Sequence, residues 1–333
     1  DFQSEINNRL PFSLISNDTA KNELVIMPGY WFEYNFYALA RNSEKLAIRD
    51  GRSDKRIYLE YDYLAPDTVN EMLEAITLLA SSTGQAYAKK KRVKKNQSFT
   101  AIGNALLQNN PAAVDQLTLL LNDAENSHRP VRLTKVNAAY RNYHRLIRYY
   151  CVKALFAIKP KGTDWMQYLI NRCEKVQKQP AAWVNVGGQL LPEQALDQLM
   201  KNICAGKISS WDQIHDWYRK QSDRYQSDKV DHALSVLLLI SNTRPSRLSR
   251  KAILSLVDEA EETEAWIMSQ IKKSREKDYQ NPFRKMLYTN EKEMEQVMGK
   301  LDHNPFIKSL EAKQTLFFQQ TARVKLLLAG KKS

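Results

Sequence analysis

Residues 136–154 have the sequence VNAAYRNYHRLIRYYCVKA, and this stretch decides the fold class. Apolar and aromatic side chains recur in it at alternating steps of four and three residues, at Val136, Tyr140, Tyr143, Ile147, Tyr150 and Ala154. This spacing places all of them on one face of an α-helix, because an α-helix turns by about 100° per residue. We therefore predict a long helix over residues 134–158, whose apolar face needs a helical neighbour to cover it.

The rest of the chain favours helices in the same way. The 10 Gly and 11 Pro among 333 residues leave few turns, which is typical of long helices and not of a sandwich or barrel. Thr68 and Glu71 match a capping box that opens a helix toward the lysines at residue 89. The repeated NPF at Asn281 and Asn304 predicts two similar helix starts, with Asn as the cap. Helical spacing predicts further helices over residues 32–48, 97–109, 111–125, 192–204, 210–225, 228–241, 247–277 and 290–328.

Strands are expected at few places. In the first 66 residues, Leu24–Met27 is apolar and Ile57–Tyr61 alternates between apolar and polar side chains, so both are predicted to be brief strands. The helical spacing of apolar residues stops around Gly187 and Gly188, which predicts a β-hairpin near residues 183–191. The predicted fold class is mainly α, with multi-helix domains, these few strands and this hairpin.

The positive charge is concentrated in one quarter of the chain. The whole chain has a formal net charge of +13, and residues 89–179 alone carry 18 basic and 5 acidic side chains, which is also +13. The charge distribution and the spacing of apolar residues together predict an irregular α+β linker region over residues 1–66. They also predict a helical, strongly basic subdomain over 67–180 and a helical C-terminal subdomain over 181–333. A concentrated positive field attracts anions, whereas scattered charge mainly aids solubility.

This basic quarter predicts an anion-binding surface. Tyrosines lie between its cations on the helix at 134–158, so that rings for stacking accompany charges for phosphates. The alternative is a solvated lysine surface and a helix whose tyrosines belong to the core. The predicted anion-binding residues are Lys89, Lys90, Lys91, Arg92, Lys94, Lys95, Arg141, His144, Arg145 and Arg148.

A polar stripe near the N-terminus predicts a second candidate site. Asn35, Asn42 and Arg49 recur every seven residues, so they share a narrow arc of one helix with Trp31. Polar groups at the edge of a core need partners, because an unpaired buried group costs about 1–3 kcal/mol. Those partners are either a ligand or the side chains of the following strand. The predicted ligand-binding residues are Trp31, Asn35, Asn42, Arg49, Tyr61 and Asp62, with Asp50 as an ion-pair partner for Arg49 or Arg52.

Other site classes lack a sequence signal. Cys151, Cys173 and Cys204 form no CxxC pair and no set with histidines at metal-ligand spacing, so we expect reduced thiols, no metal and a cytoplasmic location. We also expect no cofactor, because no dinucleotide, Walker or nucleophile motif occurs. The most apolar run, Ala233–Ile240, is far shorter than a membrane span. The chain opens with Asp1 in a polar stretch, and we expect a processed product or a part of a longer protein.

Several longer stretches carry a family resemblance. They are MPGYWFEYNFYALARN at 27–42, RDGR at 49–52, LEYDYLAPDTVNEM at 59–72, WVNVGGQLLPE at 183–193 and GKISSWDQIHDWY at 206–218. Together they resemble an uncharacterised bacterial family, a domain of unknown function, whose full-length members begin with a left-handed parallel β-helix of hexapeptide repeats. The resemblance covers most of the chain and identifies it with the helical C-terminal half of such a protein.

The resemblance implies architecture more than chemistry. Hexapeptide β-helices commonly belong to acyltransferases and nucleotide-sugar enzymes and form trimers, so the implied partners are an upstream β-helix domain, further copies of the chain, and a nucleotide sugar or another anionic ligand. Transferase chemistry would then lie upstream. No catalytic residue of the family is carried over to this sequence, and whether the chain is an enzyme stays open.

Three functional hypotheses follow. The first is a helical accessory module, for oligomerisation, substrate binding or contact with the upstream domain, in a protein related to hexapeptide-repeat transferases. The second is binding of a nucleic acid or other polyanion through residues 89–179, with an affinity that falls steeply with salt. The third is a small-molecule enzyme whose site is built from Asn35, Asn42, Arg49 and Tyr61.

Overall fold

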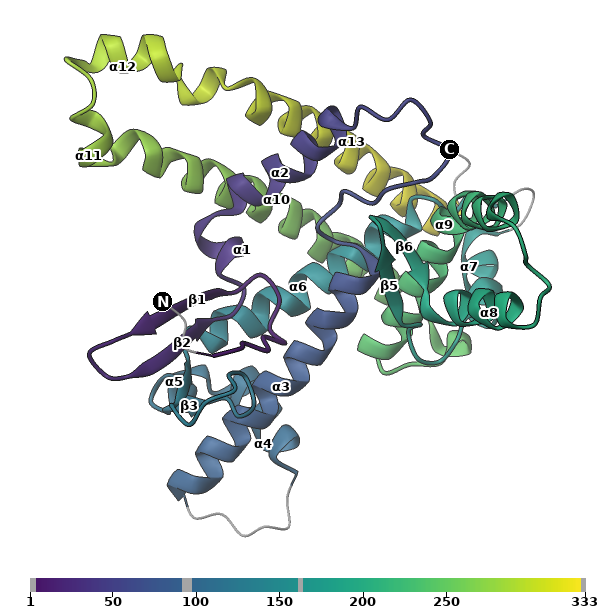
Figure 1. Cartoon of the computed structure of the whole chain (residues 1–333), viewed down its shortest axis with the longest axis horizontal. Coiled ribbons are helices and arrows are strands. Elements are labelled where there is room, and N and C mark those ends of the chain that lie inside the picture. Colours follow the sequence, from purple (N-terminus) through teal and green to yellow (C-terminus); the bar gives the residue numbers. More distant parts are fainter. Residues whose placement is uncertain (1–3, 92–97, 161–163, 331–333) are drawn as a thin grey trace.

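The computed structural model describes residues 4–91, 98–160 and 164–330, without the side chain of Asp302. The chain is mainly helical, as the sequence predicts, with short strands in its first 30 residues and a hairpin near residue 187. Figure 1 shows two pairs of helices that diverge from a common centre, with a small sheet beside them. The pairs are α3 (Pro66–Lys91) with α4 (Phe99–Asn109), and α10 (Arg250–Gln280) with α13 (Pro305–Leu328).

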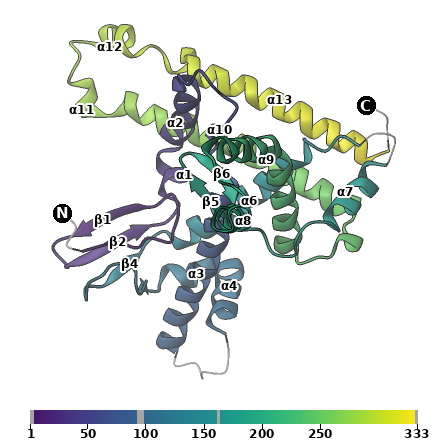
Figure 2. The same ribbon diagram turned by 45° about the vertical axis from the view of Figure 1, so that its right-hand side comes forward.

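Helix α6 (Val136–Leu155) lies at that centre and confirms the helix expected at 134–158. It packs against α3 (Pro66–Lys91), α9 (Trp211–Ile240) and α10 (Arg250–Gln280), so its apolar face has the helical neighbours that it needs (Figures 1 and 2). The aromatic members of the predicted face are buried, and Tyr143 is fully so. The main core extends along the chain from Leu10 to Leu328 and draws on all three predicted regions. The proposed division near residue 180 stays a prediction.

The N-terminal segment builds a small sheet and a broken helix. β1 (Leu14–Asp18) pairs antiparallel with β2 (Glu23–Met27), which confirms the strand expected at 24–27. The helix predicted as one piece at 32–48 is two helices, α1 (Tyr30–Tyr34) and α2 (Phe36–Arg49). Asn35 separates them, because its backbone leaves the helical region at φ −145°. The break lets both Phe32 and Phe36 enter the core, where their ring centroids lie 5.7 Å apart.

Two predictions for the segment before α3 are wrong. Residues Ile57–Tyr61 form no strand, because their backbone groups bond to side chains instead of to a neighbouring strand. The Tyr58 N–H donates to Ser222 Oγ at 2.9 Å, and Arg52 donates to the Ile57 carbonyl at 2.8 Å. Helix α3 begins at Pro66, so Thr68 is its third residue and not its cap. Thr68 Oγ1 instead accepts the Ala65 N–H at 3.0 Å.

The region between α3 and α6 contains less helix than predicted. α4 (Phe99–Asn109) confirms the helix at 97–109, and it packs closely on α3. The helix predicted at 111–125 ends early, because only α5 (Pro111–Asp115) is helical. The chain then forms β3 (Leu119–Leu120), which pairs antiparallel with β4 (Val131–Leu133). β4 lies parallel to β2, so the sheet order is β1-β2-β4-β3.

The C-terminal half differs from prediction mainly in how its helices divide. The hairpin is confirmed, with Gly187 and Gly188 at positive φ in its turn. The helices predicted at 210–225 and 228–241 are one, α9, and the helix predicted at 247–277 begins only at residue 250, as α10. The helix predicted at 290–328 is two, and α7 was not predicted. The elements not yet described are α7 (Trp165–Cys173), β5 (Trp183–Val186), β6 (Gln189–Pro192), α8 (Glu193–Cys204), η1 (Pro245–Arg247), α11 (Pro282–Lys285), α12 (Glu291–Met298), η2 (Leu301–His303) and α13 (Pro305–Leu328).

Both NPF repeats begin helices as expected. The side chain of Asn281 accepts the N–H groups of Phe283 and Arg284 at the start of α11, and Asn304 does the same at the start of α13. Proline follows in the first helical position in each case, where its missing N–H costs nothing. Figure 2 shows α13 running back along α10, with α11 and α12 at the far end of this pair.

Candidate functional site

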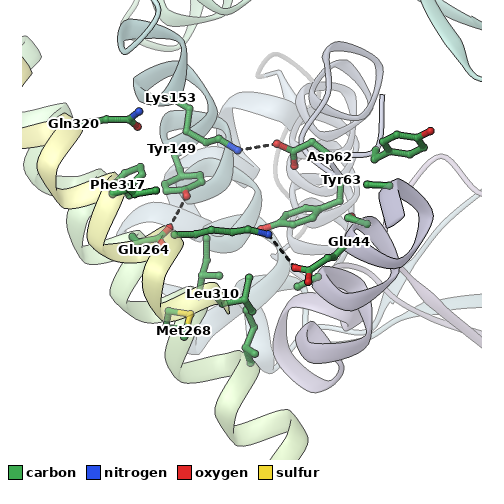
Figure 3. A pocket seen from close by; sticks show the side chains of 18 of the residues that line it. Glu44, Asp62, Tyr63, Tyr149, Lys153, Glu264, Met268, Leu310, Phe317 and Gln320 are labelled. Carbon is green, nitrogen blue, oxygen red and sulfur yellow. Dashed lines mark hydrogen bonds and ion pairs between the residues drawn. The ribbon is translucent and has the colours of Figure 1, made fainter. Parts of the chain in front are cut away.

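A cleft of about 940 Å³ lies between α2, α6, α10 and α13, with residues 61–63 at its edge. We call it the interhelical cleft. Figure 3 shows side chains from all of these elements converging on it. Its apolar lining consists of Ala40, Ala47, Ile48, Phe156, Ala157, Ile267, Met268, Ile271, Leu310, Leu316 and Phe317. Its polar lining consists of Ser43, Glu44, Tyr61, Asp62, Tyr63, Tyr149, Lys153, Glu264, Lys313 and Gln320.

A buried carboxyl forms part of its wall. Glu264 of α10 is 8% exposed and accepts a hydrogen bond from the Tyr149 hydroxyl of α6, with the two oxygens 2.5 Å apart. Burial raises the pKa of Glu264, and the hydrogen bond from Tyr149 and the charge of Lys153 only partly offset this effect. The pKa of Tyr149 is also raised, first by burial and then by the charge of Glu264. Both pKa values are therefore shifted in the direction that favours the protonated form of each group.

Two ion pairs cross the cleft (Figure 3). Lys153 Nζ of α6 lies 2.7 Å from Asp62 Oδ2, and Lys313 Nζ of α13 lies 2.9 Å from Glu44 Oε2 of α2. Burial lowers the pKa of Lys153, but the charge and hydrogen bond of Asp62 outweigh burial and leave this pKa raised. Burial likewise raises the pKa of Asp62, and the charges of Lys153 and Lys229 reverse the direction. Both members of the Lys153–Asp62 pair are therefore held in their charged forms.

The loop that carries Asp62 is itself anchored from the other side. Glu60 Oε2 lies 2.7 Å from Lys229 Nζ and also accepts the Tyr225 hydroxyl, both from α9. The carboxylate of Glu60 further accepts the Asp62 N–H at 2.9 Å. These contacts fix the backbone at 60–62 between α9 and α6, so that Asp62 reaches Lys153 from a defined direction.

The chemistry of the cleft follows from its pairing. Each lysine has a carboxylate within 2.9 Å, and the remaining carboxyl is bonded to a tyrosine. The cleft therefore combines a large apolar surface with charges that already balance one another. Such a site suits binding and orientation of a molecule that is mainly apolar. In the part of the chain that the structure describes, no group of three or more His, Cys, Asp or Glu is placed to hold a metal ion.

The ligand site predicted from sequence is divided by the structure. Tyr61 and Asp62 line the interhelical cleft, whereas Asn42 and Arg49 are exposed on α2 outside its lining. Trp31 and Asn35 are half-buried near the break between α1 and α2. Asp50 does form the expected ion pair, with Arg52 at 2.8 Å, and the Tyr61 hydroxyl donates to Asp50 at 2.9 Å. Whether this set binds a ligand stays a prediction.

The predicted anion-binding residues are also spread out. Lys89 and Lys90 line an open surface cleft of about 620 Å³ at the end of α3, where Lys91 is exposed as well. Arg92, Lys94 and Lys95 lie outside the described residues. On α6, Arg141 is exposed and the ring of His144 contacts Tyr140. The guanidinium of Arg145 lies 4.6 Å from the centre of the Trp266 ring, and that of Arg148 lies 3.5 Å from Glu259.

The tyrosines of α6 are core residues, as the alternative interpretation held. Tyr140, Tyr143, Tyr149 and Tyr150 are all at least nine-tenths buried. Their faces are therefore not available as a stacking surface for bases.

Sequence reasoning missed Lys153, Glu264 and Lys313. A usable signal existed for Glu264, because it interrupts the apolar stripe of α10 formed by Ala260, Ile267, Met268 and Ile271. A carboxyl inside such a stripe needs a partner or a raised pKa. Lys153 and Lys313 stand at the edges of their stripes, where lysines are common, so they gave no comparable signal.

The expectation of buried, reduced thiols is met in part. Cys151 and Cys173 are buried free thiols, whereas Cys204 is exposed. None of the described helices combines the length and the apolar composition needed to cross a bilayer.

Comparison with known proteins gives a similarity without an activity. Residues 168–317 match the family model described as "Domain of unknown function (DUF6819)". An "Uncharacterized protein" of Treponema pallidum (strain Nichols) is 33% identical over 311 residues, which is 93% of this chain and 41% of that protein. The chain therefore spans well under half the length of the relative that it matches. No solved structure matches the chain. Both similarities fit a family of unknown function, and the resemblance deduced from the sequence is confirmed to that extent.

Proposed function

We propose that this chain is a binding module whose interhelical cleft takes an amphipathic small molecule. The observation that carries the proposal is the combination of an apolar lining with charges that are already paired across the cleft. The molecule would place an apolar chain or ring system among α10 and α13, and a polar but uncharged or zwitterionic head near Lys153 and Asp62.

The apolar lining favours a ligand whose main part is apolar. At about 940 Å³ the cleft falls in the range that binds small molecules. Leu316 is 58% exposed and Ile48 is 75% exposed at its edges. Covering such side chains yields about 25 cal/mol for each Å² of apolar surface removed from water, so an apolar ligand gains affinity there.

The paired charges determine which polar head group fits the cleft. A multiply charged anion would compete with Asp62 for Lys153 and would lie beside the carboxylates of Asp62 and Glu44. A hydroxyl, an amide or a zwitterion can instead bond to both members of an ion pair. Among the ligands implied by the transferase resemblance, one that carries an acyl chain therefore fits this cleft better than a nucleotide sugar.

The resemblance also suggests where such a ligand would be used. A module of this kind would hold an acyl-bearing substrate for a transferase domain elsewhere in a longer protein, in a homo-oligomer. The chain spans 41% of the length of its Treponema relative, which leaves room for such a domain in that protein. The free thiols of Cys151 and Cys173 support a reducing, cytoplasmic location.

Fluorescence titration with the neutral probe N-phenyl-1-naphthylamine tests the proposal. We expect saturable binding, with displacement by dodecanol and dodecylphosphocholine and weaker displacement by dodecyl phosphate. The Leu316→Glu variant places a charge at the edge of the cleft and should weaken probe binding roughly tenfold or more. Leu326→Glu is the matched control, because Leu326 is 45% exposed on the same helix but outside the cleft lining. Equal probe binding by both variants, or none by the unmodified chain, would contradict the proposal.

Polyanion binding is the second candidate, favoured by the exposure of Lys89, Lys90 and Lys91 at the end of α3. With the tyrosines of α6 in the core, binding would rest on charge alone and would be insensitive to sequence. A salt titration with single-stranded and duplex oligonucleotides tests it. Affinity that falls steeply with salt supports this function, and no binding at low ionic strength contradicts it.

A further inference from the structure

A second cleft, separate from the first, lies where α9 turns into α10. It has a volume of about 750 Å³ and is lined by residues 242–247 of the turn, by Leu238 and Leu239 at the end of α9, and by Glu174 and Lys178 from the segment after α7. We call it the turn cleft. It shares no lining residue with the interhelical cleft and lies entirely within residues 168–317, the part that matches the domain of unknown function.

Three cations of the turn cleft have no ionic partner among the residues that the structure describes. Lys178, Arg244 and Arg247 are exposed, and none of them forms an ion pair within residues 4–91, 98–160 and 164–330. Arginines nearby behave differently: Arg172 lies 2.7 Å from Asp231, and Arg250 lies 2.8 Å from Asp164. The cleft has one carboxylate, Glu174, so its lining carries an excess of two positive charges.

The start of α10 is basic as well, although Arg250 there is already paired with Asp164. Residues 244–251 read RPSRLSRK, with four cations and no acid. Arg250 and Lys251 occupy the first turn of a helix of 31 residues, which has no acidic residue there. The N-terminal end of a helix carries a partial positive charge that favours anions and disfavours cations. An anion bound beside the turn would relieve this repulsion.

The remaining lining defines what else the ligand contains. Thr243 and Ser246 offer hydroxyl donors within the turn. Leu239, which is 39% exposed, and Pro245 give an apolar surface beside the cations. The volume is much larger than a single phosphate needs, so a ring or another apolar group can lie on this surface.

We propose that the turn cleft binds a small, soluble organic phosphate. Arg244, Arg247 and Lys178 would contact the phosphate oxygens, because guanidinium and ammonium groups form short, charge-assisted hydrogen bonds with phosphate. The organic part would lie against Leu239 and Pro245. This site differs from the anion-binding surface predicted on residues 89–148, and it stands whether or not the interhelical cleft binds an amphipath.

Isothermal titration calorimetry with ADP, pyrophosphate and adenosine tests the proposal. At low ionic strength we expect ADP to bind more tightly than pyrophosphate, and adenosine to bind negligibly. Added NaCl should weaken ADP binding, because salt screens exposed charges beyond about 10 Å at 0.1 M. Vesicles of phosphatidylcholine with phosphatidic acid should not retain the protein, which separates a soluble ligand from a lipid headgroup.

The decisive variant is the double substitution Arg244→Ala and Arg247→Ala. It should weaken ADP binding roughly tenfold or more, since two charge-assisted contacts are lost. Lys207→Ala with Lys220→Ala removes the same charge from two exposed lysines outside the cleft lining and should leave ADP binding unchanged. Thermal unfolding should show that both variants stay folded, because all four side chains are exposed. The proposal is overturned if ADP does not bind at low salt, if both double variants lose binding equally, or if only the vesicles bind.

Discussion

Gly84 of α3 lies directly against the backbone of Phe99 in α4, so closely that a Cβ added to Gly84 would overlap the Phe99 carbonyl. The relationship is reciprocal, because a Cβ added to Gly103 of α4 would overlap the Ala80 carbonyl of α3. Two glycines thus allow these helices to approach each other at backbone distance, and this contact holds α4 on the outer part of α3.

Gly84→Ala and Gly103→Ala should therefore each destabilise the chain. Alanine normally stabilises a helix interior by about 1 kcal/mol relative to glycine. Here the added methyl must push the helices apart, so we expect a net loss of roughly 1–3 kcal/mol in the free energy of unfolding, measured with urea. Gly51→Ala is the matched control, because its Cβ would meet only the Arg49 carbonyl at 3.9 Å. A loss no greater than that of the control would show that the helices are not in backbone contact.

His232 should make stability depend on pH. The Asn70 side chain donates to the Ala181 carbonyl at 2.9 Å, so its oxygen faces His232 Nε2 at 3.0 Å as an acceptor. Nε2 then carries the proton, and Nδ1 accepts the Tyr150 hydroxyl at 3.0 Å. Burial, and secondarily the charge of Lys229, lower the pKa of His232 from 6.5 to about 3. The imidazole is thus held neutral.

The direction in which pH changes the stability follows from proton binding. Between pH 6.5 and about 3 the unfolded chain binds a proton at His232 that the folded chain does not, so stability is present above pH 6.5 and is lost as pH falls. This one group contributes a slope of up to about 1.4 kcal/mol per pH unit. Urea unfolding across that range should show a shallower slope for His232→Gln than for the exposed control His215→Gln. Parallel curves for the two variants would mean that His232 is charged in the folded chain.

Local patterns predicted those parts of the fold whose cause is local. The helix α6 follows from the spacing of Val136, Tyr140 and Tyr143, and the hairpin follows from Gly187 and Gly188, which both take positive φ. The segment Ile57–Tyr61 shows the limit. Its alternation is that of a strand, but its backbone partners are the side chains of Arg52 and Ser222, and no local pattern announces them.

The interhelical cleft could not be predicted for the same reason. Asp62 and Lys153 are 91 residues apart, Tyr149 and Glu264 are 115 apart, and Glu44 and Lys313 are 269 apart. Apart from Glu264, which interrupts the apolar stripe of α10, each of these side chains looks ordinary within its own helix or loop. Only the way in which α2, α6, α10 and α13 pack brings them to one place, and this depends on the whole core.

Glu264→Gln should change the pH dependence in the opposite direction from His232→Gln. The folded chain holds a proton on Glu264 above its ordinary pKa of 4.5, so the unmodified chain loses stability as pH rises through this value. Glutamine keeps an acceptor for Tyr149 and does not titrate. Unfolding at pH 5 and pH 8 should therefore show that the variant gains stability relative to the unmodified chain at the higher pH. A constant difference between the two proteins would contradict a raised pKa for Glu264.

The ion pair between Arg129 and Glu125 should be strongly coupled, because its side chains are only 5% and 1% exposed. Arg129 donates two hydrogen bonds to the carboxylate, each 2.5 Å long, and the Ser127 hydroxyl donates a third at 2.8 Å. Removing one partner leaves the other charge buried without its main contact, so Arg129→Met should cost roughly 1–3 kcal/mol in the free energy of unfolding. Glu125→Gln should cost a similar amount for the same reason.

The double variant should lose less than the sum of the two single losses, because it leaves no buried charge behind. The exposed pair of Arg56 and Asp54, with side chains 66% and 53% exposed, is the control, and Arg56→Met should change stability little. Urea unfolding of the four variants completes the comparison. Additive losses at Arg129 and Glu125 would mean that the two charges do not depend on each other, and a loss for Arg56→Met equal to that for Arg129→Met would mean that burial does not set the strength of the pair.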